Sequence, residues 1–163
     1  MNYQVANLQL TPQGKDKIAW AWRKGAATSK TDFGNPVTAT PSYEVCVYDS
    51  SASPQPLYRG SVAAGGTCGT RACWTDKKTG YGYRNTTTNA DGIQRVTLKS
   101  GVASRSVVQV TAKGINLTPP DPMLTLPVTV QLMIDNGSGI KCFQTDYTVA
   151  TMNDTEQFRA KGP

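Results

Sequence analysis

The chain has 163 residues, which fits one domain, and it contains four cysteines and no histidine. Charged residues make up only 17 % and hydrophobic residues 38 %, with 15 Gly and 10 Pro, which excludes a highly charged disordered chain and disfavours long helices. The net charge of +6 could attract anionic polymers, but Lys and Arg are scattered along the chain without a long run. We therefore expect a soluble, moderately basic surface and no nucleic-acid partner.

Four strands are predicted in the first part of the chain. Tyr3 to Leu10 alternates in hydrophobicity, and Ile18 to Trp22 places both of its tryptophans on one face, where we expect them to be buried. Tyr43 to Tyr48 is a strongly apolar strand, and Leu57 to Val62 is its expected hairpin partner.

Further strands follow in the second part of the chain, and no segment has the pattern of an amphipathic helix. A hairpin turn at 135–139 (DNGSG) joins the last two of them. The predicted strands are Gly80 to Tyr83, Ile93 to Leu98, Ser106 to Ala112, Val128 to Ile134 and Ile140 to Val149.

These elements predict one all-β domain over residues 1–163. About eight to ten short strands separated by turns are typical of a β-sandwich of Greek-key or immunoglobulin-like type. No apolar run approaches the roughly 18 residues that a membrane-spanning helix requires, so no membrane span is expected.

The four cysteines are Cys46, Cys68, Cys73 and Cys142. A zinc site would favour two close cysteine pairs, but only Cys68 and Cys73 are close, and there is no histidine. We therefore expect disulfides and no metal. Disulfides imply an oxidising compartment, so a secreted or cell-surface location is predicted.

Four cysteines allow three pairings, and the sequence alone does not fix which one forms. The spacing favours a small loop closed by Cys68 and Cys73. It then leaves Cys46 and Cys142, each central in an apolar strand, to join an early strand to a late one. Two disulfides are therefore predicted to staple the domain.

Catalysis is not expected from this sequence. Nucleophilic catalysis most often uses a histidine base, and none is present. The acidic residues lie largely in turn-like settings, and no phosphate loop, dinucleotide fingerprint or calcium loop occurs. We expect neither an enzyme nor a cofactor.

The stapled loop and the strand after it hold the best candidates for ligand binding. Exposed aromatic rings stack on sugars or bases, and nearby cations hold anions. Alternatively, the two tyrosines are core or cross-strand pair residues and the tryptophan covers the edge of the sandwich. The candidate residues are Trp74, Tyr81, Tyr83, Arg71, Lys77 and Arg84.

Several long motifs resemble an uncharacterised accessory or C-terminal β-domain of secreted bacterial proteins. They cover nearly the whole chain, from Ile18 to Lys161, and the resemblance implies a secreted β-domain with no assigned catalytic residues. It also favours a structural role for the four cysteines. The motifs are WAWRKGAATSKTDFGNP, YEVCVYD, GGTCGTRACW, GYGYRN, GIQRVTLKSG, LTLPVTVQL, IKCFQTDY and NDTEQFRAKG.

Two functions are consistent with these features. The first is a non-enzymatic extracellular accessory module that binds a glycan or a protein. The second is a self-assembling subunit of a fibre, filament or shell, in which the N-terminal strand, Tyr3 to Leu10, completes the sheet of a neighbouring copy.

Overall fold

A computed structural model shows an all-β chain. It describes residues 5–11, 16–51, 54–86 and 91–162, the first of these ranges by its backbone alone. Within these residues all regular elements are strands, apart from one turn of 3-10 helix, η1 (Thr31–Phe33). The pairings between the named strands are antiparallel throughout.

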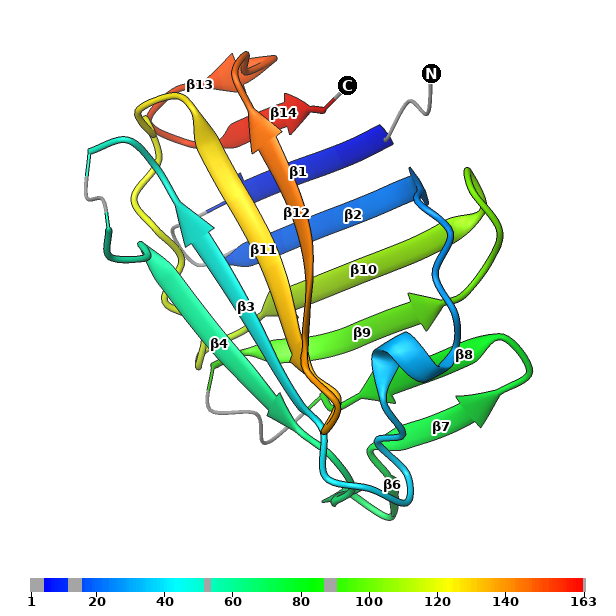
Figure 1. Ribbon diagram of the computed structural model, residues 1–163. Coiled ribbons are helices and arrows are strands. Elements are labelled where there is room, and N and C mark those ends of the chain that lie inside the picture. Colours follow the sequence, from blue (N-terminus) through cyan, green and yellow to red (C-terminus); the bar gives the residue numbers. More distant parts are fainter. Residues whose placement is uncertain (1–4, 12–15, 52–53, 87–90, 163) are drawn as a thin grey trace.

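The larger sheet contains eight described strands and forms one layer of the molecule (Figure 1). It mixes strands from both ends of the chain, because β14 near the C-terminus pairs with β1 near the N-terminus. In spatial order the strands are β13 (Met152–Asn153), β14 (Phe158–Lys161), β1 (Val5–Thr11), β2 (Lys17–Gly25), β10 (Ser106–Lys113), β9 (Ile93–Lys99), β8 (Gly80–Arg84) and β7 (Trp74–Lys77).

The smaller sheet contains four described strands, which cross in front of the larger sheet in Figure 1. Both hairpins predicted for it are confirmed, since β3 pairs with β4 and β11 pairs with β12. Their order is β12 (Ile140–Tyr147), β11 (Val128–Asp135), β3 (Ser42–Tyr48) and β4 (Tyr58–Ala63). A separate two-stranded hairpin consists of β5 (Thr67–Cys68) and β6 (Arg71–Ala72).

One hydrophobic core fills the space between the two sheets. Alternate residues of β2, β4, β10 and β11 point into it, as the period-2 pattern predicts, and both tryptophans of β2 are buried. The ring of Trp22 on the larger sheet meets that of Phe143 on the smaller one at 5.2 Å between centroids. This face-to-face packing leaves one outward face on each sheet. The Greek-key or immunoglobulin-like type stays a prediction.

The N-terminal strand differs from the edge strand that we expected. It forms β1, but β1 lies inside the larger sheet, in register with β2 over seven residues and with β14 over four. Its backbone therefore has partners on both sides, which a strand free to complete a neighbouring copy would lack. Tyr3 and Gln4, the first two residues of the predicted segment, lie outside the described residues.

No helix in the described part of the chain is long and apolar enough to cross a membrane.

Candidate functional site

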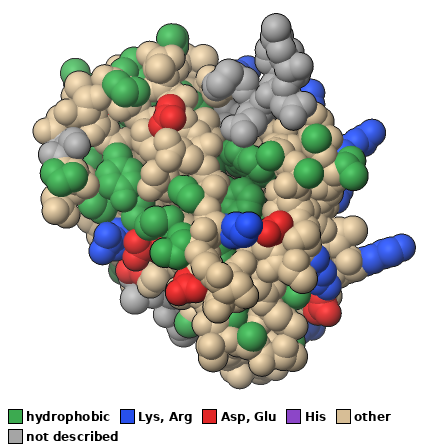
Figure 2. All heavy atoms as spheres, in the orientation of Figure 1, with side chains coloured by type: hydrophobic (Ala, Val, Ile, Leu, Met, Phe, Trp, Pro, Cys, Tyr) green, Lys and Arg blue, Asp and Glu red, His purple; other side chains and the backbone are tan. Residues whose placement is uncertain are grey.

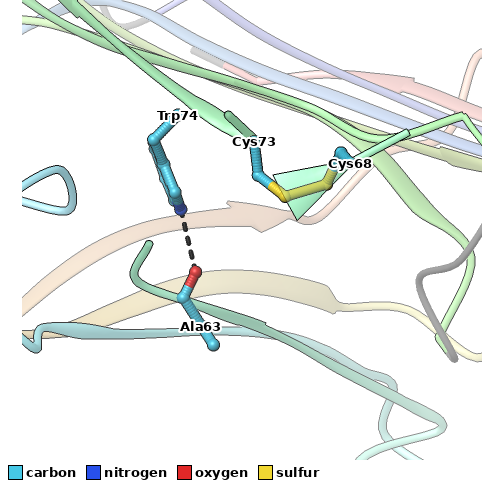
Figure 3. Close-up of a disulfide and its surroundings, with 4 residues drawn as sticks. All are labelled: Ala63, Cys68, Cys73 and Trp74. Atoms are coloured by element: carbon cyan, nitrogen blue, oxygen red, sulfur yellow. Dashed lines mark hydrogen bonds between the residues drawn. A yellow bond between two sulfur atoms is a disulfide. The ribbon is translucent and has the colours of Figure 1, made fainter. Parts of the chain in front are cut away.

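The disulfide between Cys68 and Cys73 is confirmed. It closes the β5–β6 hairpin, with the two α-carbons 4.9 Å apart (Figure 3). Gly69 turns the chain with a φ of +69°, a conformation that side chains other than glycine rarely adopt. The covalently closed loop therefore contains Arg71 and ends directly before β7, where Trp74 and Lys77 lie.

The three aromatic residues predicted as a binding platform are buried. Trp74, Tyr81 and Tyr83 are at most 5 % exposed, and they belong to the core between the sheets. The indole nitrogen of Trp74 donates a 2.8 Å hydrogen bond to the carbonyl of Ala63, as Figure 3 shows. Their binding role stays a prediction, but in this conformation their rings offer no exposed surface for stacking.

The predicted disulfide between Cys46 and Cys142 is wrong, because both residues are free thiols. They lie on the outward face of the smaller sheet, on β3 and β12, with β11 between them. Cys46 is opposite Gln131 and Cys142 is opposite Met133, so they are also offset along the strands. Two strand spacings amount to about 9.5 Å, whereas the α-carbons of a disulfide lie about 4.4–6.8 Å apart.

The two thiols differ in access. Cys46 is fully buried beneath its neighbours and approaches the carboxylate of Glu44 at 3.6 Å, whereas Cys142 is exposed on the edge strand. The pKa of both thiols is raised above the ordinary value of 9.0, and burial is the largest cause of this rise. Neither has the lowered pKa that marks a reactive cysteine.

The predicted cations do not all gather with the aromatics. Arg71 is exposed on β6 in the stapled hairpin, whereas Lys77 and Arg84 take outward positions on the larger sheet. Those positions alternate with the buried residues of the same strands, so these two cations and the aromatics point to opposite sides of the sheet.

A one-signed charge pattern marks the outward face of the larger sheet. The one acidic residue in its described strands, Asp76, stands in register with buried Tyr81, on the core side, and pairs with Lys30. In the part of the chain that the structure describes, no cation of the outward face lies within 4.0 Å of a carboxylate. We call this surface the basic face; its cations are Lys17, Arg23, Lys77, Arg84, Arg95, Lys99, Lys113, Arg159 and Lys161.

Two pairs of like charges face each other directly across strands of the basic face. Lys17 of β2 is in register with Lys113 of β10, and Arg84 of β8 is in register with Arg95 of β9. Residues in register have β-carbons about 4.5–5.5 Å apart, so like charges there destabilise the sheet. The fold retains this unfavourable arrangement without a neutralising carboxylate, which favours a binding role for the face over a purely structural one.

The four cations of these pairs surround a surface hollow of about 370 Å³. The hollow is also lined by the polar side chains of Gln94, Thr86 and Thr111. Gln94 is held in place because its amide donates to the carbonyl of Lys113 at 3.2 Å. The site thus presents four positive charges and three neutral hydrogen-bonding side chains, which suits a ligand with several anionic groups.

A second hollow of about 270 Å³ adjoins the first and shares Arg95 and Thr111 with it. It extends across β9, β10 and β2 as far as Arg23. The guanidinium of Arg23 lies beside Gln109: with the Gln109 amide turned to suit its neighbours, its oxygen accepts from Nη2 and Nε of Arg23 at 2.6 and 3.1 Å. The concave surface therefore crosses several strands.

The outward face of the smaller sheet differs in charge. Figure 2 shows this side of the molecule, where acidic and basic side chains are interspersed among apolar and neutral ones. Arg59 there pairs with Glu44 at 3.5 Å. The outward face of the smaller sheet thus lacks the one-signed charge of the basic face.

Sequence reasoning found only Lys77 and Arg84 of the basic face. The other cations lie far apart in the chain and meet because β2, β8, β9 and β10 are neighbours in the sheet. A signal was present, since nearly all charged residues within the strands of this sheet are Lys or Arg at outward positions, whereas the described acidic residues other than Asp76 lie outside these strands. Without the strand order, these positions could not be joined into one surface.

Metal chemistry has no support in the described residues, where no group of three or more Cys, Asp or Glu residues could hold an ion. Comparison with known protein families, curated proteins and solved structures finds no match for this chain. The resemblance to a domain of secreted bacterial proteins stays a prediction.

Proposed function

We propose that the chain is a non-enzymatic, extracellular β-sandwich module that binds an anionic ligand through its basic face. The observation that carries this proposal is the convergence of Lys17, Arg84, Arg95 and Lys113 on one hollow without a neutralising carboxylate in the described residues. Such a surface raises the local concentration of anions and favours their binding.

Two further features support the proposal. The disulfide between Cys68 and Cys73 fits an oxidising compartment, where extracellular modules fold and act. The absence of histidine from the sequence and of a recognisable catalytic motif favours binding over catalysis. No observation favours the self-assembling subunit, because the strand expected to join copies is paired on both sides within its own sheet.

The proposal is tested by binding of the whole chain to heparin, used as a polyanionic probe, in a salt series. We expect binding that weakens as salt is raised, because exposed charges are screened. The double variant Arg84→Gln/Arg95→Gln should lose about tenfold in affinity, which corresponds to about 1.4 kcal/mol.

The matched control is Arg71→Gln/Arg105→Gln, which removes two exposed cations outside the basic face. It should bind within about twofold of the unchanged protein. Absence of binding, or equal losses in both double variants, would overturn the proposal. Circular dichroism on each variant shows that the fold is retained.

A further inference from the structure

The middle of the basic face is uncharged and made of small or neutral side chains. Strand register places one such residue on each of five neighbouring strands, in a line perpendicular to the strand direction. We call this line the neutral rung; its residues are Ala21, Gln109, Thr97, Gly82 and Thr75. At about 4.8 Å between strands, the neutral rung is about 19 Å long from β2 to β7.

Cations flank the neutral rung on both sides. On one side of the neutral rung, Arg95 and Arg84 each lie two positions from the rung residue of their own strand. On the other side, Arg23, Lys99 and Lys77 also lie two positions from the rung residue of their strands. Two residues along a strand amount to about 6.7 Å. The long cationic side chains therefore form two rows, and the low surface between them is a trough.

Over β2 and β10 the trough coincides with a surface hollow. The 270 Å³ hollow lies over Ala19, Ala21 and Gln109 and is bounded by Arg23 on one side and Arg95 on the other. The 370 Å³ hollow shares Arg95 and Thr111 with it and lies on the other side of Arg84 and Arg95, away from the neutral rung. At the β7 end, the ammonium of Lys77 lies directly over Gly82, on the floor of the trough.

The side chains of the trough disfavour several classes of ligand. Its described strands carry no exposed aromatic ring, since Trp20, Trp22, Tyr81 and Tyr83 all point to the core. Single-stranded nucleic acid and neutral glycans, which are bound largely by stacking, lack their main contact here. The trough is formed by strands of one sheet, and the one described helix, η1, is a single turn, too short to read the major groove of a duplex.

A membrane surface also fits poorly, because insertion requires exposed apolar side chains beside the cations. The most exposed apolar side chains of the described residues, Val102 and Ile115, lie in loops, and the one on a strand of the larger sheet, Met152, is opposite Arg159 and outside the neutral rung. What remains is a linear polymer with anionic groups on its flanks and hydroxyl groups that meet threonine and glutamine side chains.

We infer that the basic face binds one chain of a linear anionic polysaccharide, laid along the neutral rung across β2, β10, β9, β8 and β7, with its carboxylate or sulfate groups held by the two cation rows. This inference rests on the proposed function and adds the ligand class and its path. The hydroxyl of Thr97 and the amide of Gln109 face the sugar hydroxyl groups.

Calorimetry with a polyuronate oligosaccharide series, of about two to ten sugar units, tests the inference. Affinity should rise with length while new units gain contacts along the trough, and then level off once its span is filled. The carboxyl-reduced form of the same oligosaccharide should lose at least tenfold in affinity. A single-stranded oligonucleotide of equal charge should bind at least tenfold more weakly than the uronate.

A substitution that fills the trough without changing its charge tests the path. Ala21→Gln places a long neutral side chain on the floor and should weaken oligosaccharide binding by about tenfold. Ala103→Gln, at an exposed loop position outside the face, is the matched control and should leave affinity unchanged. Thermal melting verifies that both variants fold.

The outcomes separate the two proposals. If the oligonucleotide binds as tightly as the uronate, or if Ala21→Gln has no effect while Arg84→Gln/Arg95→Gln weakens heparin binding, the polysaccharide inference is overturned and the basic face still binds anions. If neither heparin nor any oligosaccharide binds, the proposed function falls together with the inference.

Discussion

The ammonium of Lys77 lies over Gly82 of the neighbouring strand, where a β-carbon on residue 82 would come 3.0 Å from the lysine nitrogen. Because this neighbour is the end of a flexible side chain, it can move aside when a methyl group is added. Gly82→Ala should therefore fold, and loss of glycine flexibility should stabilise it by up to about 1 kcal/mol. The ammonium would leave the floor of the trough, so heparin affinity should fall about twofold.

Gly80 on the same strand provides the contrast. A β-carbon there would lie 1.8 Å from the backbone carbonyl oxygen of Leu98, which cannot move without breaking the β8–β9 pairing. Gly80→Ala should therefore cost more than about 2 kcal/mol. Urea unfolding of the two variants measures both effects; similar stabilities would contradict this assignment of roles to the two glycines.

Labelling with a thiol reagent should separate the two free cysteines. In the folded protein only Cys142 should react, because Cys46 is fully buried. Since burial raises the pKa of the Cys142 thiol above 9.0, its rate of labelling should keep increasing with pH beyond that value. Mass spectrometry should show one label in buffer and two in denaturant.

The variant Cys142→Ser is the control for this experiment, and it should take up no label while folded. Mild oxidation of the unchanged protein should not join Cys46 to Cys142 within one chain, because β11 separates their strands. A monomer that loses both free thiols without taking up reagent would mean that the two sulfurs can meet after all.

Much of the fold follows from local patterns. The strand predicted over Val128 to Ile134 and the DNGSG turn after it predicted the β11–β12 hairpin, and the observed burial of β11 alternates as a period of two requires. The short loop between Cys68 and Cys73 predicted their bond, since residues so close in sequence can meet without other constraints.

The errors arise where the answer depends on which strands are neighbours. Cys46 and Cys142 were expected to bond because each is central in an apolar strand, yet burial of Cys46 comes from side chains on the outward face of its sheet. The basic face was missed for the same reason: Lys17 and Lys113 are 96 positions apart in the chain but in register in the sheet. The periodicity of a strand shows which of its side chains face the core, but it does not show which strand lies beside it.

Reduction of the disulfide should lower stability by a moderate amount. A loop of about six residues constrains the unfolded chain by roughly 2 kcal/mol in the chain-entropy model. For a protein of this size, we expect the melting temperature to fall by about 4–8 °C. The double variant Cys68→Ser/Cys73→Ser should melt at this lower temperature and be insensitive to reductant.

The core contacts of the following strand should survive this change. Trp74 keeps its hydrogen bond to Ala63 and its packing against Tyr43, at 4.7 Å between ring centroids. The fluorescence spectrum of the folded double variant should therefore match that of the unchanged protein. A large red shift would show instead that the disulfide holds Trp74 in the core.

Acid should weaken one link between the loop at η1 and the smaller sheet. The carboxylate of Asp32 accepts hydrogen bonds of 2.7 Å from the side chain and backbone of Ser29, and it pairs with Lys141 of β12 at 3.0 Å. These contacts, the hydrogen bond from the Ser29 side chain foremost, hold the pKa of Asp32 below its ordinary value of 3.8.

The lowered pKa of Asp32 determines whether stability rises or falls with pH. The ionised carboxylate favours the folded state, so its contribution is complete above the ordinary value and is lost as the pH falls through the lowered one. Because the group is partly exposed and pairs with an exposed lysine, the contribution is at most about 1 kcal/mol. Asp32→Asn should therefore be less stable than the unchanged protein at pH 7. Urea unfolding should show this difference shrinking at pH 2, and a difference independent of pH would mean that the carboxylate's charge plays no part.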